Sequence, residues 1–203
     1  MDEESPRERW RGAILPSNVE PAAQTAPEKN PTWRVVQSPW LIGALVITTF
    51  NLYAFWWLGR TWSQLKQEDQ DAGKRPVWHV LSMVVPIYGY FRFHAHMRTI
   101  VQIGATDEAR STLNPLAMTL AWFVITLLSA TAARMPEPGW IGLLPGFLSG
   151  ALIGWAQHGL NTTWRSLPGG AVRGRVHVLH ILLLFLGAAL LVLAIFALLV
   201  AGQ

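Results

Sequence analysis

Six histidines are the residues of this chain best suited to bind a metal ion or transfer a proton. His177 and His180 are three residues apart, so a helix places both on one face, whereas His94 and His96 point to different faces. Proton pumps and divalent-cation carriers usually need carboxylates at membrane depth, and the long apolar segments contain no Asp or Glu. We therefore expect hydrogen-bonded histidines, with neither a metal nor a cofactor.

Serine chemistry is the second reaction type that the residues suggest. The motif Gly146-Phe-Leu-Ser149-Gly150, followed by His177 or His180, is superficially similar to the dyad of rhomboid-type intramembrane proteases. Those enzymes carry G-x-S-G, and the extra residue here moves the first glycine about 100° around a helix. The zinc-protease motif H-E-x-x-H and cysteine nucleophiles are both absent from the sequence. The sequence therefore predicts no catalytic residue and a protein that is not an enzyme.

Arg92 is the basic residue that the pattern places at membrane depth, where a charge marks a candidate functional site. The apolar run from Val77 meets Pro86 and then Arg92, which leaves about fifteen residues or ~22 Å of helix. Either Arg92 extends to the headgroups and the segment crosses, or the chain breaks at Pro86-Ile87-Tyr88-Gly89 and returns. In the second arrangement Arg92, Tyr88 and Pro86 would line a pathway.

Four glycines, Gly142, Gly146, Gly150 and Gly154, recur at strict four-residue spacing. This spacing removes side chains from one stripe of a helix, so that another helix can approach closely. We expect the partner to be another segment of the same chain. The alternative is a self-association surface, or a sliding surface in a transporter. Pro145 within the stripe should bend the helix locally.

Long apolar segments are the elements that would position these residues. Residues 181–200 carry no charged or strongly polar side chain, and about twenty such residues span a ~30 Å hydrocarbon core. With this stretch included, the predicted membrane segments are 40–58, 77–97, 116–133, 140–158 and 178–201. Three repeated units each begin with a proline followed within two residues by tryptophan, at Pro39-Trp40, Pro76-Val77-Trp78 and Pro138-Gly139-Trp140.

Each repeated unit ends in a short polar helix that carries a bulky residue and, three positions later, an aliphatic one. The pairs are Trp62 and Leu65, Met97 and Ile100, and Trp164 and Leu167. This pattern predicts helices that lie in the interface plane, near 60–70, 92–103 and 161–167. The predicted fold class is an all-α integral membrane protein, a bundle of four or five transmembrane or re-entrant helices with interfacial amphipathic helices.

Residues 39–203 form the predicted membrane domain, whereas residues 1–38 are rich in proline and mixed charge and are predicted to be a disordered tail. The chain is 51% hydrophobic and 14% charged, below the quarter or so that is usual in soluble proteins. Its net charge of +4 fits contact with anionic lipid and does not indicate nucleic acid. Aromatic residues such as Trp56 and Trp57 are expected to form a belt at the headgroups.

The orientation can be predicted from basic residues, which collect on the cytoplasmic side. Five crossings give only a weak excess on one side. A re-entrant second segment separates the charges more cleanly, with Arg134, Lys29 and Arg34 opposite the others. That arrangement, however, exports a charged tail without a signal peptide. We therefore favour five crossings with the N-terminus in the cytoplasm.

The aromatic turns of the repeated units resemble those of small bacterial multi-pass membrane proteins of unknown function, whose units read roughly G-I-Y-x-x-Y-W before a basic residue. The matching stretches are Asn51-Leu-Tyr53-Ala-Phe-Trp56-Trp57 with Arg60, Pro86-Ile-Tyr88-Gly-Tyr90-Phe91 with Arg92, and a degenerate Leu152-Ile-Gly-Trp155-Ala-Gln-His158. The resemblance implies a helical protein of the bacterial inner membrane and brings no catalytic residue with it.

The sequence therefore predicts a non-enzymatic structural or interaction role in the cell membrane, as an accessory subunit or an oligomer packed through the glycine stripe. The expected partners are the lipid bilayer and either a second copy or another membrane protein. The alternative function is a small transporter or channel, with the broken second segment lining a pathway.

Overall fold

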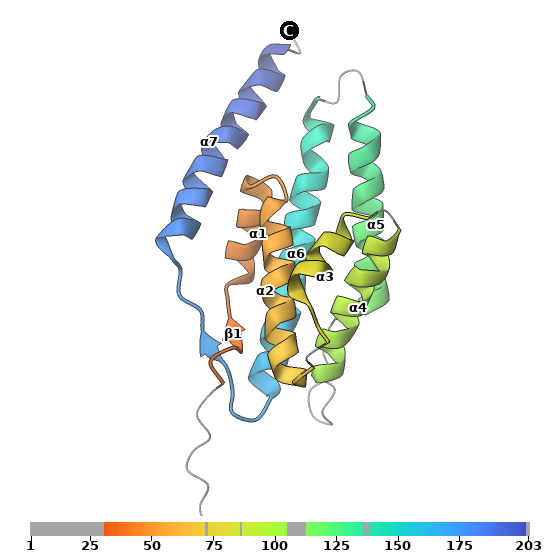
Figure 1. Ribbon diagram of the computed structural model, residues 1–203. Helices are drawn as coiled ribbons and strands as arrows, with labels where there is room; N and C mark the ends of the chain where they lie inside the picture. The colour runs from red at the N-terminus through yellow and green to blue at the C-terminus, as the bar shows by residue number, and fades with distance from the viewer. Residues whose placement is uncertain (1–30, 72, 86, 105–112, 136–138, 202–203) are drawn as a thin grey trace, which may run out of the picture.

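The computed structural model describes residues 31–71, 73–85, 87–104, 113–135 and 139–201. These residues are mostly helical. The helices are α1 (Pro39–Thr48), α2 (Leu52–Asp69), α3 (Pro76–Met83), α4 (Tyr88–Ile103), α5 (Pro115–Ala132), the 3₁₀-helix η1 (Gly139–Leu143), α6 (Leu144–Ser166) and α7 (Val178–Ala201). Two short strands, β1 (Val35–Val36) and β2 (Val172–Arg173), pair in parallel near one end of the bundle (Figure 1).

The predicted segment 40–58 is not a single helix. The chain leaves α1 after Thr48, turns through Phe50 and Asn51, and returns as α2 (Figure 1). Both turn residues have positive φ, 50° and 71°, a conformation that asparagine tolerates better than most residues. The hydroxyl of Thr49 donates to the carbonyl oxygen of Leu45 at 2.6 Å. An apolar turn of this kind does not interrupt the hydropathy of the segment. Hydropathy alone therefore predicts one continuous helix over residues 40–58.

The predicted segment 77–97 is also broken, which agrees with one of its two predicted arrangements. Between Met83 and Tyr88 the chain reverses direction, so α3 and α4 form a second helical hairpin (Figure 1). A Cβ atom at Gly89 would lie 2.4 Å from the carbonyl oxygen of Met83, so this reversal needs glycine there. Pro86 lies outside the described residues, and Ile87 next to it has a φ of 66°.

Helices α5 and α7 match the predicted segments 116–133 and 178–201 closely. By length and composition, these two of the described helices are apolar enough to cross a membrane. The predicted segment 140–158 begins in η1 and continues in α6 to Ser166. Figure 1 shows α5 and α6 extending beyond both hairpin turns, and α7 running obliquely at the side of the bundle.

The buried core is formed by residues of α1, α2, α4, α5 and α6. Figure 1 shows that α2, α4 and α6 run in the same direction. The residue pairs of the repeated units belong to this core. Trp62, Leu65, Met97, Ile100 and Trp164 are buried in one cluster, with Leu167 packed against it. The predicted interfacial helices 60–70, 92–103 and 161–167 are therefore the C-terminal parts of α2, α4 and α6, and their apolar residues are buried within the fold.

Trp57 is also part of this core and not of an aromatic belt. Its side chain is fully buried, and its indole N–H donates to the side-chain oxygen of Gln157 at 2.6 Å. The amide of Gln157 donates to Asn161 at 2.7 Å, and Asn161 donates to the carbonyl oxygen of Gln37 at 2.6 Å. Buried polar groups are thus satisfied across α2, α6 and the segment before α1.

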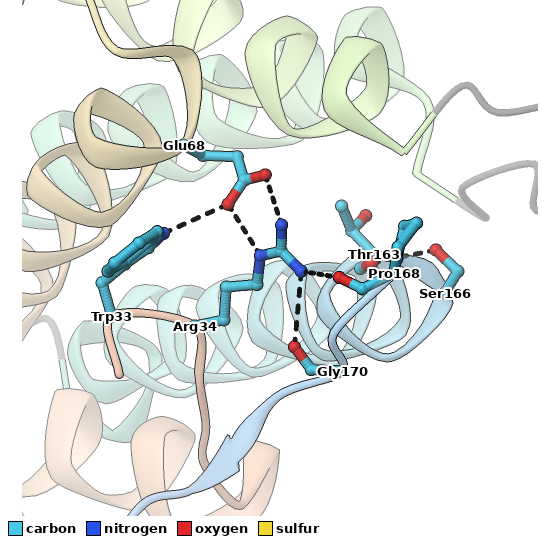
Figure 2. Close-up of polar contacts among 7 residues, drawn as sticks. All are labelled: Trp33, Arg34, Glu68, Thr163, Ser166, Pro168 and Gly170. Atoms are coloured by element: carbon cyan, nitrogen blue, oxygen red, sulfur yellow. Dashed lines mark hydrogen bonds and ion pairs between the residues drawn. The ribbon is translucent and has the colours of Figure 1, made fainter. Parts of the chain in front are cut away.

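The boundary of the predicted N-terminal tail also differs in the structure. Residues 1–30 lie outside the described part, but residues 31–38 belong to the fold. Figure 2 shows Arg34 facing Glu68 of α2, with two contacts of 2.7 Å to the two carboxylate oxygens. The indole N–H of Trp33 donates to the same carboxylate at 3.1 Å. This charge-assisted bidentate pairing explains why residues 31–38 are ordered although they lie in the predicted tail.

Arg34 also connects this segment to the loop after α6. Its guanidinium donates to the carbonyl oxygens of Pro168 and Gly170 (Figure 2). The hydrogen bonds from Arg34 lower the pKa of Glu68, so the carboxylate stays charged well into the acidic range. Together with the β1–β2 pair, these contacts join the first described residues to the last loop of the bundle.

Basic residues gather at the end of the molecule where β1 and β2 lie. This end includes the C-terminal turns of α2, α4 and α6 and their loops (Figure 1). The basic residues there are Arg34, Lys66, Lys74, Arg75, Arg98, Arg165, Arg173 and Arg175. Among the described residues, Arg134 is the basic residue at the opposite end, after α5, and Arg60 and Arg92 lie part-way along α2 and α4. We call these the basic end and the apolar end.

Candidate functional site

Arg92 lies at a pocket between the end of α2, the α2–α3 loop, α3 and α4. The pocket has a volume of about 370 Å³. It is lined by Trp62, Asp71, Gly73, Lys74, Arg75, Trp78 and Arg92. We call it the Arg92 pocket. Three basic side chains and two tryptophans around one acidic side chain make a site suited to an anion.

The α2–α3 loop has a defined shape that places its basic residues at the pocket. Gln70 ends α2 in the left-handed conformation, with a φ of 53°. The side chain of Asp71 then accepts a hydrogen bond from the backbone N–H of Gly73 at 2.8 Å, forming an Asx-type turn. Pro76 begins α3 directly after Arg75, because proline suits the first position of a helix.

The charges around the pocket are only partly compensated. The ammonium group of Lys74 pairs with the carboxylates of Asp69 and Asp71. Arg75 and Arg92 form no ion pair with any described residue. Lys74 carries one positive charge against the two carboxylates of Asp69 and Asp71, so with Arg75 and Arg92 these five groups leave a net charge of +1 around the pocket.

Trp62 and Arg92 present hydrogen-bond donors without acceptors. Trp62 is only 5% exposed, and its indole N–H is buried with no partner in the described part of the chain. The Nε of Arg92 is buried and unpaired in the same way. Leaving such groups unsatisfied costs about 1–3 kcal/mol each, and anionic oxygens would satisfy both.

Cations lie near the aromatic rings of this site. The guanidinium carbon of Arg92 is 5.9 Å from the ring centre of Trp62 and 6.0 Å from that of Tyr88. The ammonium of Lys74 lies 5.8 Å from the Trp62 ring. Cation–π attraction at these distances favours the observed position of Arg92. The structure thus brings Arg92 and Tyr88 together, while Pro86 is outside the described residues.

A buried pair of histidines supports Trp62. The ring of His79 stacks on Trp62 with 3.9 Å between ring centres and 3° between planes. Nε2 of His79 lies 3.0 Å from Nδ1 of His96, and Nε2 of His96 lies 3.0 Å from the hydroxyl of Thr61. That hydroxyl donates to the carbonyl oxygen of Trp57 at 2.8 Å.

The hydrogen bond from Thr61 to Trp57 constrains the donors in this series of hydrogen bonds. Because the hydroxyl of Thr61 donates to a carbonyl oxygen, it accepts from Nε2 of His96, and in a neutral His96 the Nδ1 atom then accepts from Nε2 of His79.

The pair supports the position of Trp62, because His79 stacks on its ring and is held in turn by His96. The sequence does not predict this pair, because the two residues lie on different helices and share no motif. They are nearly equidistant from the chain reversal at Ile87, so a hairpin centred there places them opposite each other. The position of the chain reversal at Ile87 is therefore the sequence signal that could identify this histidine pair.

Other histidines also have hydrogen-bond partners. Nε2 of His180 lies 3.3 Å from the hydroxyl of Tyr53, and Nδ1 of His180 accepts from the backbone N–H of His177 at 3.2 Å. Nδ1 of His94 lies 3.3 Å from the hydroxyl of Thr119 on α5. Within the part of the chain that the structure describes, no three His, Asp or Glu side chains are placed to hold a metal ion.

The glycine stripe meets α1 over half of its length. A Cβ atom at Gly150 would lie 2.8 Å from the carbonyl oxygen of Gly43, and one at Gly154 would lie 3.1 Å from that of Pro39. At these two positions α6 packs closely on α1 within the same chain. Gly146 faces open space, and Gly142 belongs to η1 and not to α6. The stripe is therefore not a continuous packing surface in the monomer.

In comparisons with known proteins, no family model, no curated protein and no solved structure matches this chain. The resemblance to bacterial membrane proteins with repeated aromatic units thus stays an expectation from the sequence.

Proposed function

We propose that this chain is a non-enzymatic, multi-pass protein of the bacterial inner membrane, with an interaction or accessory role at the cytoplasmic surface. In this proposal α5, α6 and α7 cross the bilayer, and the hairpins α1–α2 and α3–α4 enter it from the cytoplasmic side and return. The observation that carries the proposal is the separation of the basic end from the apolar end.

The exposed apolar surface supports insertion of α5 and α7. Of their most apolar windows, only 11% of α5 and 6% of α7 is buried within the fold. Phe185 on α7, for example, is 74% exposed. Soluble monomers rarely expose contiguous apolar patches larger than a few hundred Å². A hydrocarbon environment would cover this surface without a protein partner.

The lengths of α1 and α3 support re-entry. Their ten and eight residues correspond to about 15 and 12 Å of helix, well short of a ~30 Å hydrocarbon core. The side chains of Phe50 and Ile87 at the turns are exposed. Backbone groups there are satisfied locally, since the N–H of Asn51 donates to Val46 at 2.9 Å and that of Gly89 to Val85 at 2.9 Å. Irregular backbone needs such partners at membrane depth.

The orientation follows from the rule that basic residues remain in the cytoplasm. If the basic end is cytoplasmic, two hairpins and three crossings leave the N-terminal segment on that side and Arg134 outside. This arrangement removes the difficulty of exporting a charged tail, which arose when only the second segment was re-entrant.

Single cysteines can test this topology, because the natural chain contains none. An impermeant maleimide applied to intact cells should label the variant Arg134→Cys. Ser63→Cys and Ser166→Cys should react only after the membrane is permeabilised. Five crossings would place residue 63 outside, so labelling of Ser63→Cys in intact cells would reject re-entry of α1–α2. Residues 134 and 166 serve as outside and inside controls in both arrangements.

A small transporter or channel is the second candidate function. In it, the re-entrant α3–α4 hairpin would line the pathway and the Arg92 pocket would bind the substrate. The substrate would be an anion. Flux of such an anion into liposomes that is abolished by Arg92→Ala would favour this function over the interaction role. Equal flux with and without the substitution would count against it.

A further inference from the structure

We propose that the Arg92 pocket binds the phosphate of an anionic phospholipid from the surrounding bilayer. This inference rests on the proposed re-entry of the α3–α4 hairpin, which brings the pocket to the headgroup layer. The ligand chemistry is a phosphate diester with one negative charge, such as the headgroup of phosphatidylglycerol.

The charge around the pocket fits one such group. Lys74 pairs with the carboxylates of both Asp69 and Asp71, whereas Arg75 and Arg92 form no ion pair with a described carboxylate. Together these five groups carry a net charge of +1. A phosphate diester would balance this charge, because arginine binds phosphate oxygens through several N–H groups at once.

Unpaired donors at the pocket provide a second, independent argument. The indole N–H of Trp62 and the Nε of Arg92 are buried and lack acceptors among the described residues. Trp62 cannot easily rotate to find water, since His79 stacks on its ring at 3.9 Å. A phosphate carries enough oxygens to accept from both donors.

Exposed apolar side chains on the helices that form the pocket favour a lipid, and not a free anion, as the occupant. Trp78, which lines the pocket, is 64% exposed, and Val77 and Leu81 on α3 and Phe91 on α4 are exposed as well. A soluble phosphate would gain nothing from these apolar side chains. The acyl chains of a phospholipid would cover them, while the headgroup occupied the basic pocket.

The test uses full-length protein labelled with ¹⁵N in its tryptophan indoles and reconstituted in phosphatidylcholine nanodiscs. The variant Trp62→Phe identifies the Trp62 indole resonance. We expect added phosphatidylglycerol to shift this proton downfield, as a new hydrogen bond forms, and the same concentration of inorganic phosphate to leave it unchanged. A shift with both anions would overturn the lipid assignment, and no shift with phosphatidylglycerol would overturn the site itself.

Matched variants on α4 separate the pocket from general charge attraction. Arg92→Gln should weaken the apparent affinity for phosphatidylglycerol about tenfold, the equivalent of one charge-assisted hydrogen bond. Arg98→Gln removes the same charge from the same helix outside the pocket and should leave the affinity within about twofold. Equal losses for both variants would contradict specific binding. Failure of the topology proposal would appear separately, in the maleimide labelling, because the nanodisc exposes both faces.

Discussion

Arg34 and Glu68 show how a single ion pair can order a segment whose composition predicts disorder. The exposed fractions of the two side chains are 11% and 15%, and the guanidinium uses several of its donors on one carboxylate and two carbonyl oxygens. Exposed ion pairs contribute little to stability, but largely buried bidentate pairs with further hydrogen bonds contribute more. This one ion pair therefore joins the segment before α1 to α2.

This pair predicts a loss of stability in acid. Glu68 has a lowered pKa in the folded state, so its contribution is complete above the ordinary value of 4.5 and is lost as the pH falls below it. Thermal unfolding in detergent, measured between pH 7 and pH 3, should show this decline. Glu68→Gln should lower stability at pH 7 by about 1–3 kcal/mol and flatten the acidic decline.

Asp69→Asn is the matched control for that substitution. It removes a neighbouring carboxylate whose side chain is 33% exposed and whose partner is Lys74. The expected loss is below about 1 kcal/mol. If both variants lost equal stability at pH 7, the special role of the Arg34 pair would be refuted.

At the scale of elements, close contact between α1 and α6 depends on particular glycines. A Cβ atom at Gly150 would meet both the Gly43 carbonyl oxygen and the side chain of Ile47, whereas one at Gly146 would meet nothing within 4 Å. The two positions lie one helical turn apart and differ only in what faces them. They form a natural pair for mutagenesis.

Gly150→Leu should separate α1 from α6 and prevent correct folding, because backbone atoms of Gly43 cannot move aside. Gly146→Leu should leave the monomer folded, with a melting temperature close to that of the unmodified protein. Size-exclusion chromatography and thermal unfolding in detergent measure both outcomes. Loss of an oligomer in Gly146→Leu alone would assign that half of the stripe to self-association, and equal behaviour of the two variants would contradict the packing.

Elements could be predicted from the sequence where hydropathy alone defines them, as for α5 and α7. The hairpins could not, because a turn made of Phe50 and Asn51 leaves an apolar segment apolar and changes only its direction. Pro86 indicates the second break, which is one of the two arrangements that the sequence allows. Of the residues that line the Arg92 pocket, the sequence indicates only Arg92 as a candidate functional residue. Trp62, His79 and the α2–α3 loop join it through tertiary contacts that no local pattern encodes.

The whole molecule combines a packed bundle at the basic end with one helix that has few neighbours. Among the described elements, α7 contacts mainly α1 and η1. Gly187 of α7 passes close to Thr48, and His180 bonds to Tyr53. The buried cluster contains no residue of α7, although Leu183 and Leu184 pack against its edge. The helix is therefore an attachment to the bundle and not part of its core.

Deletion of residues 177–203 should consequently leave the bundle folded in detergent. We expect a moderate fall in melting temperature, because the truncated chain loses the Tyr53 hydrogen bond and the contact at Thr48. Near-ultraviolet circular dichroism should retain the signal of buried tryptophans such as Trp57 and Trp164. Loss of that signal would show that α7 is needed for folding of the core.

The pairing of β1 with β2 has a consequence for the order of events during synthesis. Arg34 and Pro168 are 134 residues apart, and Val35 pairs with Val172. The ribosome therefore releases the first hairpin long before its closing partner exists, and domains of this size emerge over seconds. During that interval β1 has an unpaired edge, and Arg34 has only Glu68. Closure of the fold is thus a late event, which occurs only after α6 and β2 have been made.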